Sequence, residues 1–520
     1  MTSPQQTPII TNKWVVAVTV MLPTFIEIMD TSVVNVSLPH IQGSLSAGLD
    51  EVTWVLTSYL VSNAIIIPIT GWLSGLLGRR RYLMISLILF TASSLVCGVA
   101  PSLGILITAR IIQGLGGGGL QPLSQAILLE TFPPEEHGMA MAVFGMGVVL
   151  APIMGPVFGG WLTDTWSWRW IFYLNLPTGI LAVTLVWLFI HDPLYIRRRV
   201  QKIDSWGLFF LTVGLGCLQI VLDKGQREDW FSSDFIVAFT LVAAAALTLF
   251  VWVESHAEHP VVDLRAFRDR SFTAGTLIVF CGFFCLFGSF VLLPLFLQNL
   301  MGYTAFWAGL VLGPGGIAAF LSMPVAGFLM KQKVAPRLLL GIGLTFSAVA
   351  LWLMSGFNLQ VDFKTAAWPR LIQGFGIGLF FVPLSAATFV NISKERTGNA
   401  SGIFNLMRNL GGSCGVAFAT TMLSRGTQLH QNTLIGHISP YHPAFQFYYE
   451  QIQKWLHIQS PQIATPSASL EAIYREVLRQ ASVLAFNDTF GMLCVATAML
   501  VPVTLLFRRG QADGKQELLM

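Results

Sequence analysis

The stretch WVVAVTVMLPTFIEIMDTSVVNVSL, residues 14–38, is a long apolar run that contains two acidic residues, Glu27 and Asp30. About 20 apolar residues are enough to cross a bilayer as a helix. A charged side chain at the bilayer centre costs roughly 2.5–3.5 kcal/mol on insertion scales, so one that is retained there usually serves a function. The spacing of three residues places both carboxylates on one helix face. The run therefore predicts a membrane helix with a face that can bind and release protons.

The composition of the whole chain extends this interpretation. Of its 520 residues 54% are hydrophobic and 11% are charged, whereas soluble domains carry about 25% charged residues. A polytopic membrane protein is indicated, rather than a soluble enzyme or a nucleic-acid-binding protein. The six cysteines all fall in apolar segments and the nine histidines in loops or at span ends, which argues against disulfides and against a metal site.

Fourteen apolar segments are long enough to span the membrane. They lie near 14–38, 52–74, 82–100, 104–130, 138–163, 169–190, 204–222, 234–254, 272–299, 305–330, 336–356, 366–390, 399–424 and 484–507. Lysine and arginine gather in alternate loops, for example at 79–81 and 197–202, whereas the intervening short loops hold only Lys224, Arg227 and Lys364. Because cytoplasmic loops are rich in these residues, we expect both termini in the cytoplasm.

The two halves of the chain resemble each other in sequence. Residues 109–124 read ARIIQGLGGGGLQPLS and residues 369–385 read PRLIQGFGIGLFFVPLS, which pairs Arg110 with Arg370. Internal repeats are typical of secondary transporters, whose substrate binds between the repeats near the midplane. We therefore predict 6+2+6 helices: a six-helix bundle in 1–200, two inserted helices in 201–260 and a second bundle in 261–520.

Several motifs give the chain a family resemblance that covers almost its whole length. They are MDTSVVNVSLP (29–39), GWLSGLLGRRR (71–81), RIIQGLGGG (110–118) and APIMGPVFGG (151–160). With these motifs the chain resembles the major facilitator superfamily, and within it the fourteen-span drug:proton antiporters of the EmrB/QacA type. Two further stretches, WRWIFYLNLPTG (168–179) and LQIVLDKGQREDWFSS (218–233), are similar to the EmrB branch.

The resemblance implies an all-α fold and proton-driven export of lipophilic toxic compounds from the bacterial inner membrane by alternating access, with no cofactor beyond the proton gradient. It also implies a periplasmic membrane-fusion adaptor of the EmrA type and an outer-membrane channel of the TolC type as partners. Two alternatives remain open: a stand-alone exporter in a cell with a single membrane, and a membrane sensor that transports nothing.

The resemblance carries over a set of residues that control conformation. They are Gly71, Gly78, Arg79, Arg80, Arg110, Gly114, Pro152, Gly155, Pro156 and Gly159. The loop motif departs from the family pattern, because its usual acid is Gly75 and the next base is Leu76. Residues 79–81 therefore have two interpretations, a latch that contacts helix ends or a positive anchor on the cytoplasmic side only.

The proton-coupling candidates are Asp30, Glu27 and Arg110. At 1.5 Å per residue, Asp30 lies about 12 Å and Arg110 about 9 Å below the outer ends of their helices, so a contact between them is compatible with both depths. Such a pair either switches with protonation or is a static ion pair. The segment 272–299 contains no acid beside Arg370, so we assign proton chemistry to the N-terminal half.

A second set of residues is expected to line the substrate cavity. They are Glu27, Phe25, Tyr59, Gln113, Phe144, Phe284, Asn405 and Arg408. Arg408 either meets an anionic group of the substrate or makes a structural contact between helices, and the aromatic residues either line the cavity or pack. The long outer loop at 425–483, with an amphipathic helix at 469–480, is either a docking element for the adaptor or a peripheral segment without a binding role.

Overall fold

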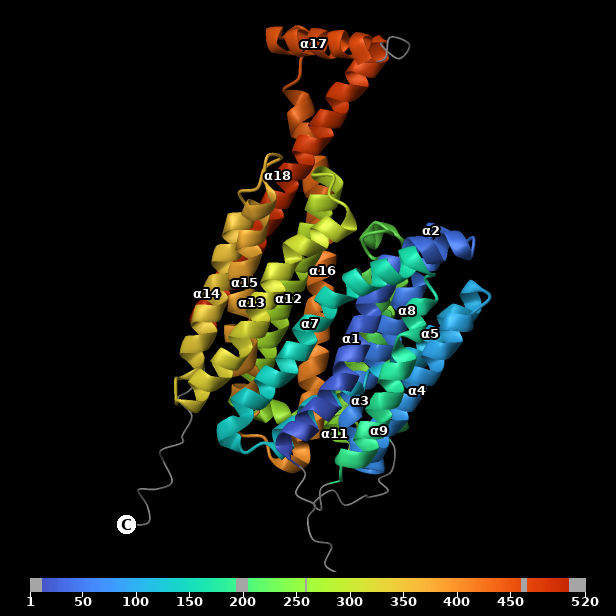
Figure 1. Cartoon of the computed structure of the whole chain (residues 1–520), viewed down its shortest axis with the longest axis vertical. Helices are drawn as coiled ribbons and strands as arrows, with labels where there is room; N and C mark the ends of the chain where they lie inside the picture. Colours follow the sequence, from blue (N-terminus) through green and yellow to red (C-terminus); the bar gives the residue numbers. More distant parts are fainter. Residues whose placement is uncertain (1–11, 193–203, 258–259, 460–464, 505–520) are drawn as a thin grey trace, which may run out of the picture.

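The computed structural model describes residues 12–192, 204–257, 260–459 and 465–504, and within these ranges the secondary structure is helical throughout (Figure 1). The helices of the N-terminal half are α1 Lys13–Ser44, α2 Leu49–Val52, α3 Trp54–Leu77, α4 Arg79–Val99, α5 Leu103–Gly117, α6 Leu120–Thr131, α7 His137–Thr165, α8 Trp170–Tyr173 and α9 Asn175–Phe189. The inserted helices are α10 Ser205–Lys224 and α11 Asp234–His256. The C-terminal half contains α12 Arg270–Leu295, α13 Ala305–Lys331, α14 Pro336–Met354, α15 Phe363–Thr388, α16 Thr397–Gly436, α17 Pro443–Gln459 and α18 Pro466–Val503.

Thirteen candidate spans in the described chain are long and apolar enough to cross a membrane. The segment predicted near 399–424 lies in α16, which is not among them, although it runs through the C-terminal bundle (Figure 1). Buried Ser401, Asn405 and Arg408 make α16 more polar than its neighbours. The all-helical prediction is confirmed, and the count by length and hydropathy is one short of fourteen.

Local sequence sets several helix boundaries. Asp269 and Asp362 each cap a helix, accepting hydrogen bonds from the backbone N–H groups of Phe272 (2.8 Å) and Thr365 (3.0 Å). The segment predicted as one helix over 104–130 is divided into α5 and α6 between Gly117 and Leu120. The division falls within the glycine run, because glycine is a poor helix former.

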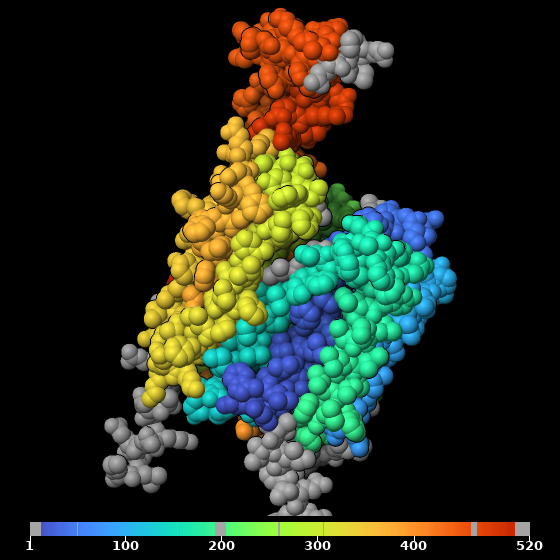
Figure 2. All heavy atoms as spheres, in the orientation of Figure 1, coloured from blue at the N-terminus to red at the C-terminus, as the bar shows by residue number. Residues whose placement is uncertain are grey.

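The two halves lie side by side and meet along an oblique seam (Figures 1 and 2). The lower face in Figure 1, defined here by Lys13, Glu136 and Lys331, is where α1 begins and α13 ends. Glu136 pairs with Lys13 of its own half and, at 3.6 Å, with Lys331 of the other half. A Cβ on Gly327 of α13 would stand 3.0 Å from the carbonyl oxygen of Gly138 of α7. The halves are therefore closely packed on the lower face.

The inserted helix α10 lies against both halves. The Gln219 side chain donates to Ser413 of α16 at 3.1 Å, and Trp230, in the turn after α10, donates to Thr421 of α16 at 3.0 Å. On the other side Lys224 donates to the Thr53 hydroxyl at 2.8 Å. The insert thus contacts both bundles.

The segment predicted as an outer loop at 425–483 is mostly helical. α16 and α18 both continue above the bundle as a stalk, and α17 lies across its top (Figure 1). The amphipathic helix predicted at 469–480 is the first part of α18. Polar sequence led to the prediction of a loop, but two long helices that extend beyond the bundle pair with each other through contacts such as Gln431 to Tyr474, 2.9 Å.

Candidate functional site

Asp30 of α1 and Arg110 of α5 form an ion pair in the interior of the N-terminal half. The Arg110 guanidinium donates to Asp30 Oδ2 at 2.6 Å, and the two side chains are 0% and 1% exposed. Asp30 Oδ1 accepts from Gln113 at 3.1 Å and from Asn175 at 2.6 Å. Three side chains therefore donate hydrogen bonds to the Asp30 carboxylate: those of Arg110, Gln113 and Asn175.

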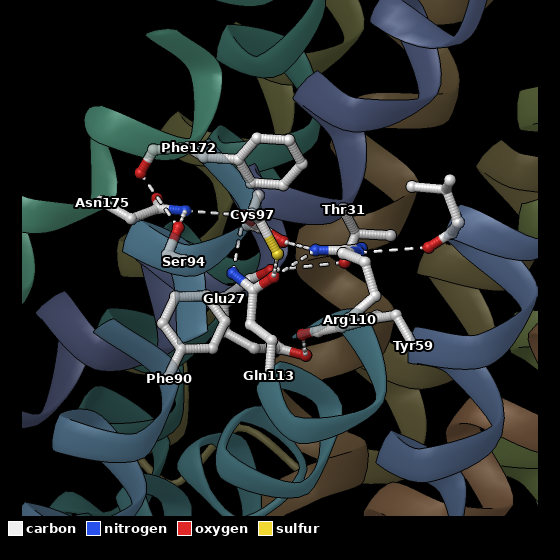
Figure 3. A network of polar contacts seen from close by, with 12 residues as sticks. Glu27, Thr31, Tyr59, Phe90, Ser94, Cys97, Arg110, Gln113, Phe172 and Asn175 are labelled. Carbon is white, nitrogen blue, oxygen red and sulfur yellow. Dashed lines mark hydrogen bonds and ion pairs between the residues drawn. The ribbon is translucent and has the colours of Figure 1, made fainter. Parts of the chain in front are cut away.

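Arg110 is held by further contacts, which Figure 3 shows at close range. Its Nε donates to the carbonyl oxygen of Val55 at 3.1 Å, and one terminal nitrogen also donates to Gln113 at 2.7 Å. The guanidinium carbon lies 4.1 Å from the centre of the Tyr59 ring, within the range of a cation–π interaction. The other terminal nitrogen is buried with no hydrogen-bond partner in the described chain, so it can donate to a further acceptor.

Glu27 lies three residues before Asp30 and has a different environment. It is 4% exposed, and its Oε1 accepts from the Tyr59 hydroxyl at 3.1 Å and from Asn63 at 3.0 Å. Its Oε2 accepts from the Gln121 amide, whose own oxygen accepts from Arg408 of the other half. Among the residues that the structure describes, Glu27 therefore reaches a cation through the Gln121 amide, in a chain of hydrogen bonds that crosses from one half to the other.

A second polar contact joins the halves beside this chain of hydrogen bonds. Asn405 of α16 donates to the Gln125 oxygen of α6 at 2.6 Å, and Ser401 donates to the same oxygen at 3.0 Å. The Ser401 hydroxyl also lies 2.7 Å from the carbonyl oxygen of Pro122. The first turns of α16 and the first turns of α6 thus share buried polar contacts, which are costly to separate unless new partners replace the old ones.

The predicted cavity residues divide into two groups. Tyr59, Gln113, Asn405 and Arg408 join Glu27 in the buried polar networks. The three phenylalanines do not. Phe144 is fully buried 6.2 Å from Phe381, Phe284 packs 5.2 Å from Phe418, and Phe25 packs against an apolar cluster near the upper end of α1.

Four amide residues of the networks were missed by the sequence interpretation: Asn63, Gln121, Gln125 and Asn175. Each is an amide within or beside an apolar segment, and such polar residues generally face the interior of a membrane bundle. That signal was present in the sequence. It does not say which acid each amide contacts, because the partners lie on other helices.

The conformational motifs lie where halves and helices approach closely. Arg79 forms a buried ion pair with Glu130, and a Cβ on Gly398, at the start of α16, would stand 2.8 Å from the Arg79 guanidinium. Gly398 is in the first turn of α16, whereas the latch interpretation expects the last carbonyls of a helix, so the choice between a latch and an anchor stays a prediction. Gly71 packs on the backbone of Asn399, with its Cβ position 2.5 Å from the Asn399 Cα.

Gly78 and Arg80 complete the lower turn between α3 and α4. Gly78 has φ +89°, a conformation that favours glycine. The Asp192 carboxylate fills the space where a Cβ on Gly78 would stand, and it accepts from the Arg80 N–H at 2.9 Å. Gly114 packs against α3, with its Cβ position 2.6 Å from the carbonyl oxygen of Tyr59.

The small residues of α7 fit directly against α1, the helix that carries both acids. Ser32 donates to the carbonyl oxygen of Pro152 at 3.2 Å and lies over Gly155, while a Cβ on Gly159 would stand 2.9 Å from Val33. Pro156 lies in α7, and its side chain is outside the described residues. A shift of α7 must therefore be accompanied by a shift of α1, because the helices leave no space between them.

The family model of the Major Facilitator Superfamily matches residues 20–416. The chain belongs to this superfamily. It is a transporter rather than an enzyme. Among its relatives, Multidrug export protein EmrB of Haemophilus influenzae is 39% identical over 437 residues, with 84% of this chain and 85% of that protein covered. Multidrug export protein EmrB of Escherichia coli K12 is 38% identical over 478 residues, with 92% of each chain covered.

The fold is also that of solved members of the superfamily. The crystal structure of the human organic anion transporter MFSD10 has a TM-score of 0.59 to this chain at 15% identity, and covers 94% of this chain and 99% of its own. At this identity the likeness concerns the fold alone. Asp30 and Arg110 lie on helices of the N-terminal bundle, and both side chains are buried in its interior.

Proposed function

We propose that this protein exports several lipophilic drugs in exchange for protons, by alternating access between its two bundles. The observation that carries the proposal is the Asp30–Arg110 ion pair, 2.6 Å long and closed to solvent. If Asp30 takes up a proton, Arg110 becomes a buried charge without a counter-charge, which costs several kcal/mol. Protonation is therefore linked to a rearrangement in which Arg110 finds other acceptors or solvent.

The helices packed around the ion pair form a route along which the rearrangement can reach the contact between the halves. α1 is packed on the small residues of α7, and α7 packs on α13 of the other half at Gly138 and Gly327. A movement of α1 that follows the loss of the ion pair is transmitted through α7 to the contact between the halves. The hydrogen bonds from Glu27 through Gln121 to Arg408 must break when the halves separate, so this is where a drug can replace protein contacts.

The names of the relatives support drugs as the substrates. The two buried acids, Glu27 and Asp30, support the proton as the driving ion. No cofactor is part of the proposal. We place the protein in the bacterial inner membrane with α16 as a fourteenth span and with the lower face, which carries Lys13, Lys331 and Arg79, in the cytoplasm.

The stalk supports a tripartite pump. In this orientation α17 lies outside the membrane, with large apolar side chains in solvent: Phe447 is 65%, Trp455 56% and Ile458 82% exposed. Exposed apolar patches on a polar segment are typical of interaction sites. We propose that the stalk contacts a periplasmic adaptor of the EmrA type, which joins an outer-membrane channel of the TolC type. A stand-alone exporter would transport equally well without these partners.

The experiment that tests the transport mechanism uses purified protein in proteoliposomes with an imposed pH gradient. Asp30→Asn should abolish gradient-driven drug transport while drug binding is retained, because the uncharged amide cannot exchange a proton. Asp164→Asn, at a carboxylate that is 73% exposed, is the matched control and should transport normally. Gradient-driven transport by Asp30→Asn at the wild-type rate would exclude Asp30 as the coupling residue.

A further inference from the structure

The C-terminal half repeats part of the Asp30–Arg110 network with one change. Arg370 of α15 donates to the oxygen of Gln373, as Arg110 does to the oxygen of Gln113. Gln373 in turn donates to the hydroxyl of Ser289 on α12 at 3.0 Å. In the N-terminal half the corresponding amide donates, at 3.1 Å, to the carboxylate of Asp30. Ser289 therefore occupies the position of the acid, and the repeat retains its cation without the carboxylate.

Arg370 is buried without a counter-charge. The residue is 5% exposed, its guanidinium carbon lies 4.4 Å from the centre of the Phe290 ring, and it forms no ion pair within the described ranges. Its single side-chain hydrogen bond there is the one to Gln373. Three other buried arginines differ. Arg79 and Arg110 form ion pairs, and Arg408 reaches Glu27 through one amide.

This arrangement has an energetic consequence. Arginine stays protonated in proteins, so the charge on Arg370 cannot be removed by loss of a proton. An uncompensated buried charge is costly, and the contact with Phe290 recovers only part of that cost. The two guanidinium nitrogens that have no partner among the described residues are donors suited to an anion, and a carboxylate matches their planar geometry.

We propose that Arg370, with Gln373 and Ser289, forms a binding site for a monovalent anion. The anion takes the part that Asp30 plays in the other half, and Phe290 provides an apolar surface beside it. α15 begins at Phe363 on the upper side, so Arg370 lies about 10 Å along the helix from that end at 1.5 Å per residue. The anionic group is either chloride from the solution or the carboxylate of an organic acid. The site does not depend on drug export by this protein, because it concerns binding alone.

The test measures the melting temperature and the binding heat of the purified full-length protein as a monovalent anion replaces sulfate, which is divalent, at constant ionic strength. One arm adds chloride. The other adds benzoate, with benzamide as the uncharged analogue. We expect at least one of the two anions to raise the melting temperature and benzamide to leave it unchanged. Arg370→Gln should weaken the anion affinity at least about tenfold, because a hydrogen-bonded charge is lost. Arg227→Gln, at an exposed arginine after α10, should respond like wild type.

A second variant keeps the proposal falsifiable if Arg370→Gln does not fold. Ser289→Asp retains the arginine and places a carboxylate where the other half has one, so its melting temperature should no longer respond to the anion. A response to chloride alone identifies an ion site, and a response to benzoate alone identifies an organic-acid site. The proposal is overturned if neither anion acts on wild type, or if Ser289→Asp or Arg370→Gln responds as wild type does. Proteoliposome transport is scored separately, so failure of this site and failure of drug export are distinguishable.

Discussion

A double-mutant cycle on Asp30 and Arg110 tests whether the two residues act as one unit. Arg110→Gln leaves a carboxylate that is 1% exposed with two neutral amide donors, and Asp30→Asn leaves a guanidinium that is 0% exposed without a counter-ion. Removal of one partner of a buried pair typically costs about 3–5 kcal/mol. The double variant leaves neither charge uncompensated. We therefore expect its loss to be smaller than the sum of the single losses by about 2–3 kcal/mol, within the range measured for directly coupled residues.

The assay is the free energy of unfolding in mixed micelles, followed by tryptophan fluorescence as denaturing detergent is added. An exposed pair in the same protein serves as the control. Glu471 and Arg475 of α18 are 59% and 76% exposed and lie one helical turn apart, so their coupling should be near zero. Drug affinity is measured on the same four proteins. Additive losses for Asp30 and Arg110, within about 0.5 kcal/mol, would refute the reasoning that links protonation of one to movement of the other.

Three further changes test other contacts. Gly155→Leu should reduce transport more than tenfold, since the added side chain collides with Ser32 of α1; wild-type efflux from proteoliposomes would contradict this. Arg79→Gln should lower the free energy of unfolding by about 3 kcal/mol through loss of the buried pair with Glu130, and an unchanged value would show that the pair contributes nothing. Replacement of 437–465 by a short Gly/Ser linker should spare transport by the isolated protein but reduce co-purification with an adaptor; equal recovery would place docking elsewhere.

The depths of the two charges, estimated from the sequence, were compatible with a contact between Asp30 and Arg110, and the structure contains that contact. Each helix was recognisable from its apolar length, and a shared depth follows from the rise per residue. The acids Glu27 and Asp30 were conspicuous because charge is rare at that depth. The roles of Glu27 and Asp30 in the transport cycle are still predictions, because they concern how the structure changes when a proton binds.

The contacts of the amides could not be predicted in the same way. Asn175 contacts Asp30 from a helix 145 residues later in the chain, and Gln121 joins Glu27 to an arginine of the other half. Such pairings depend on how helices rotate about their axes in the folded bundle, which local patterns do not determine. The stalk is a similar case. Its polar composition was read as a loop, yet α16 and α18 continue through it as a helical pair with α17 above.

Tyr59 connects the two acidic sites and suggests how they communicate. Its hydroxyl donates to Glu27 at 3.1 Å, and its ring lies 4.1 Å from the guanidinium of Arg110. If protonation of Asp30 allows Arg110 to move, the cation leaves the face of the ring, and the tyrosine loses the contact that fixes its plane. The hydrogen bond to Glu27 then loses its geometry, which weakens the connection through Gln121 to Arg408. A proton bound on the side of Asp30 is thereby converted into looser contact between the halves at Glu27, where the drug is proposed to bind. We propose that both acids lie on one helix face for this reason: Asp30 exchanges a proton beside an arginine of its own half, and Glu27 transmits the change through Gln121 to the arginine of the other half.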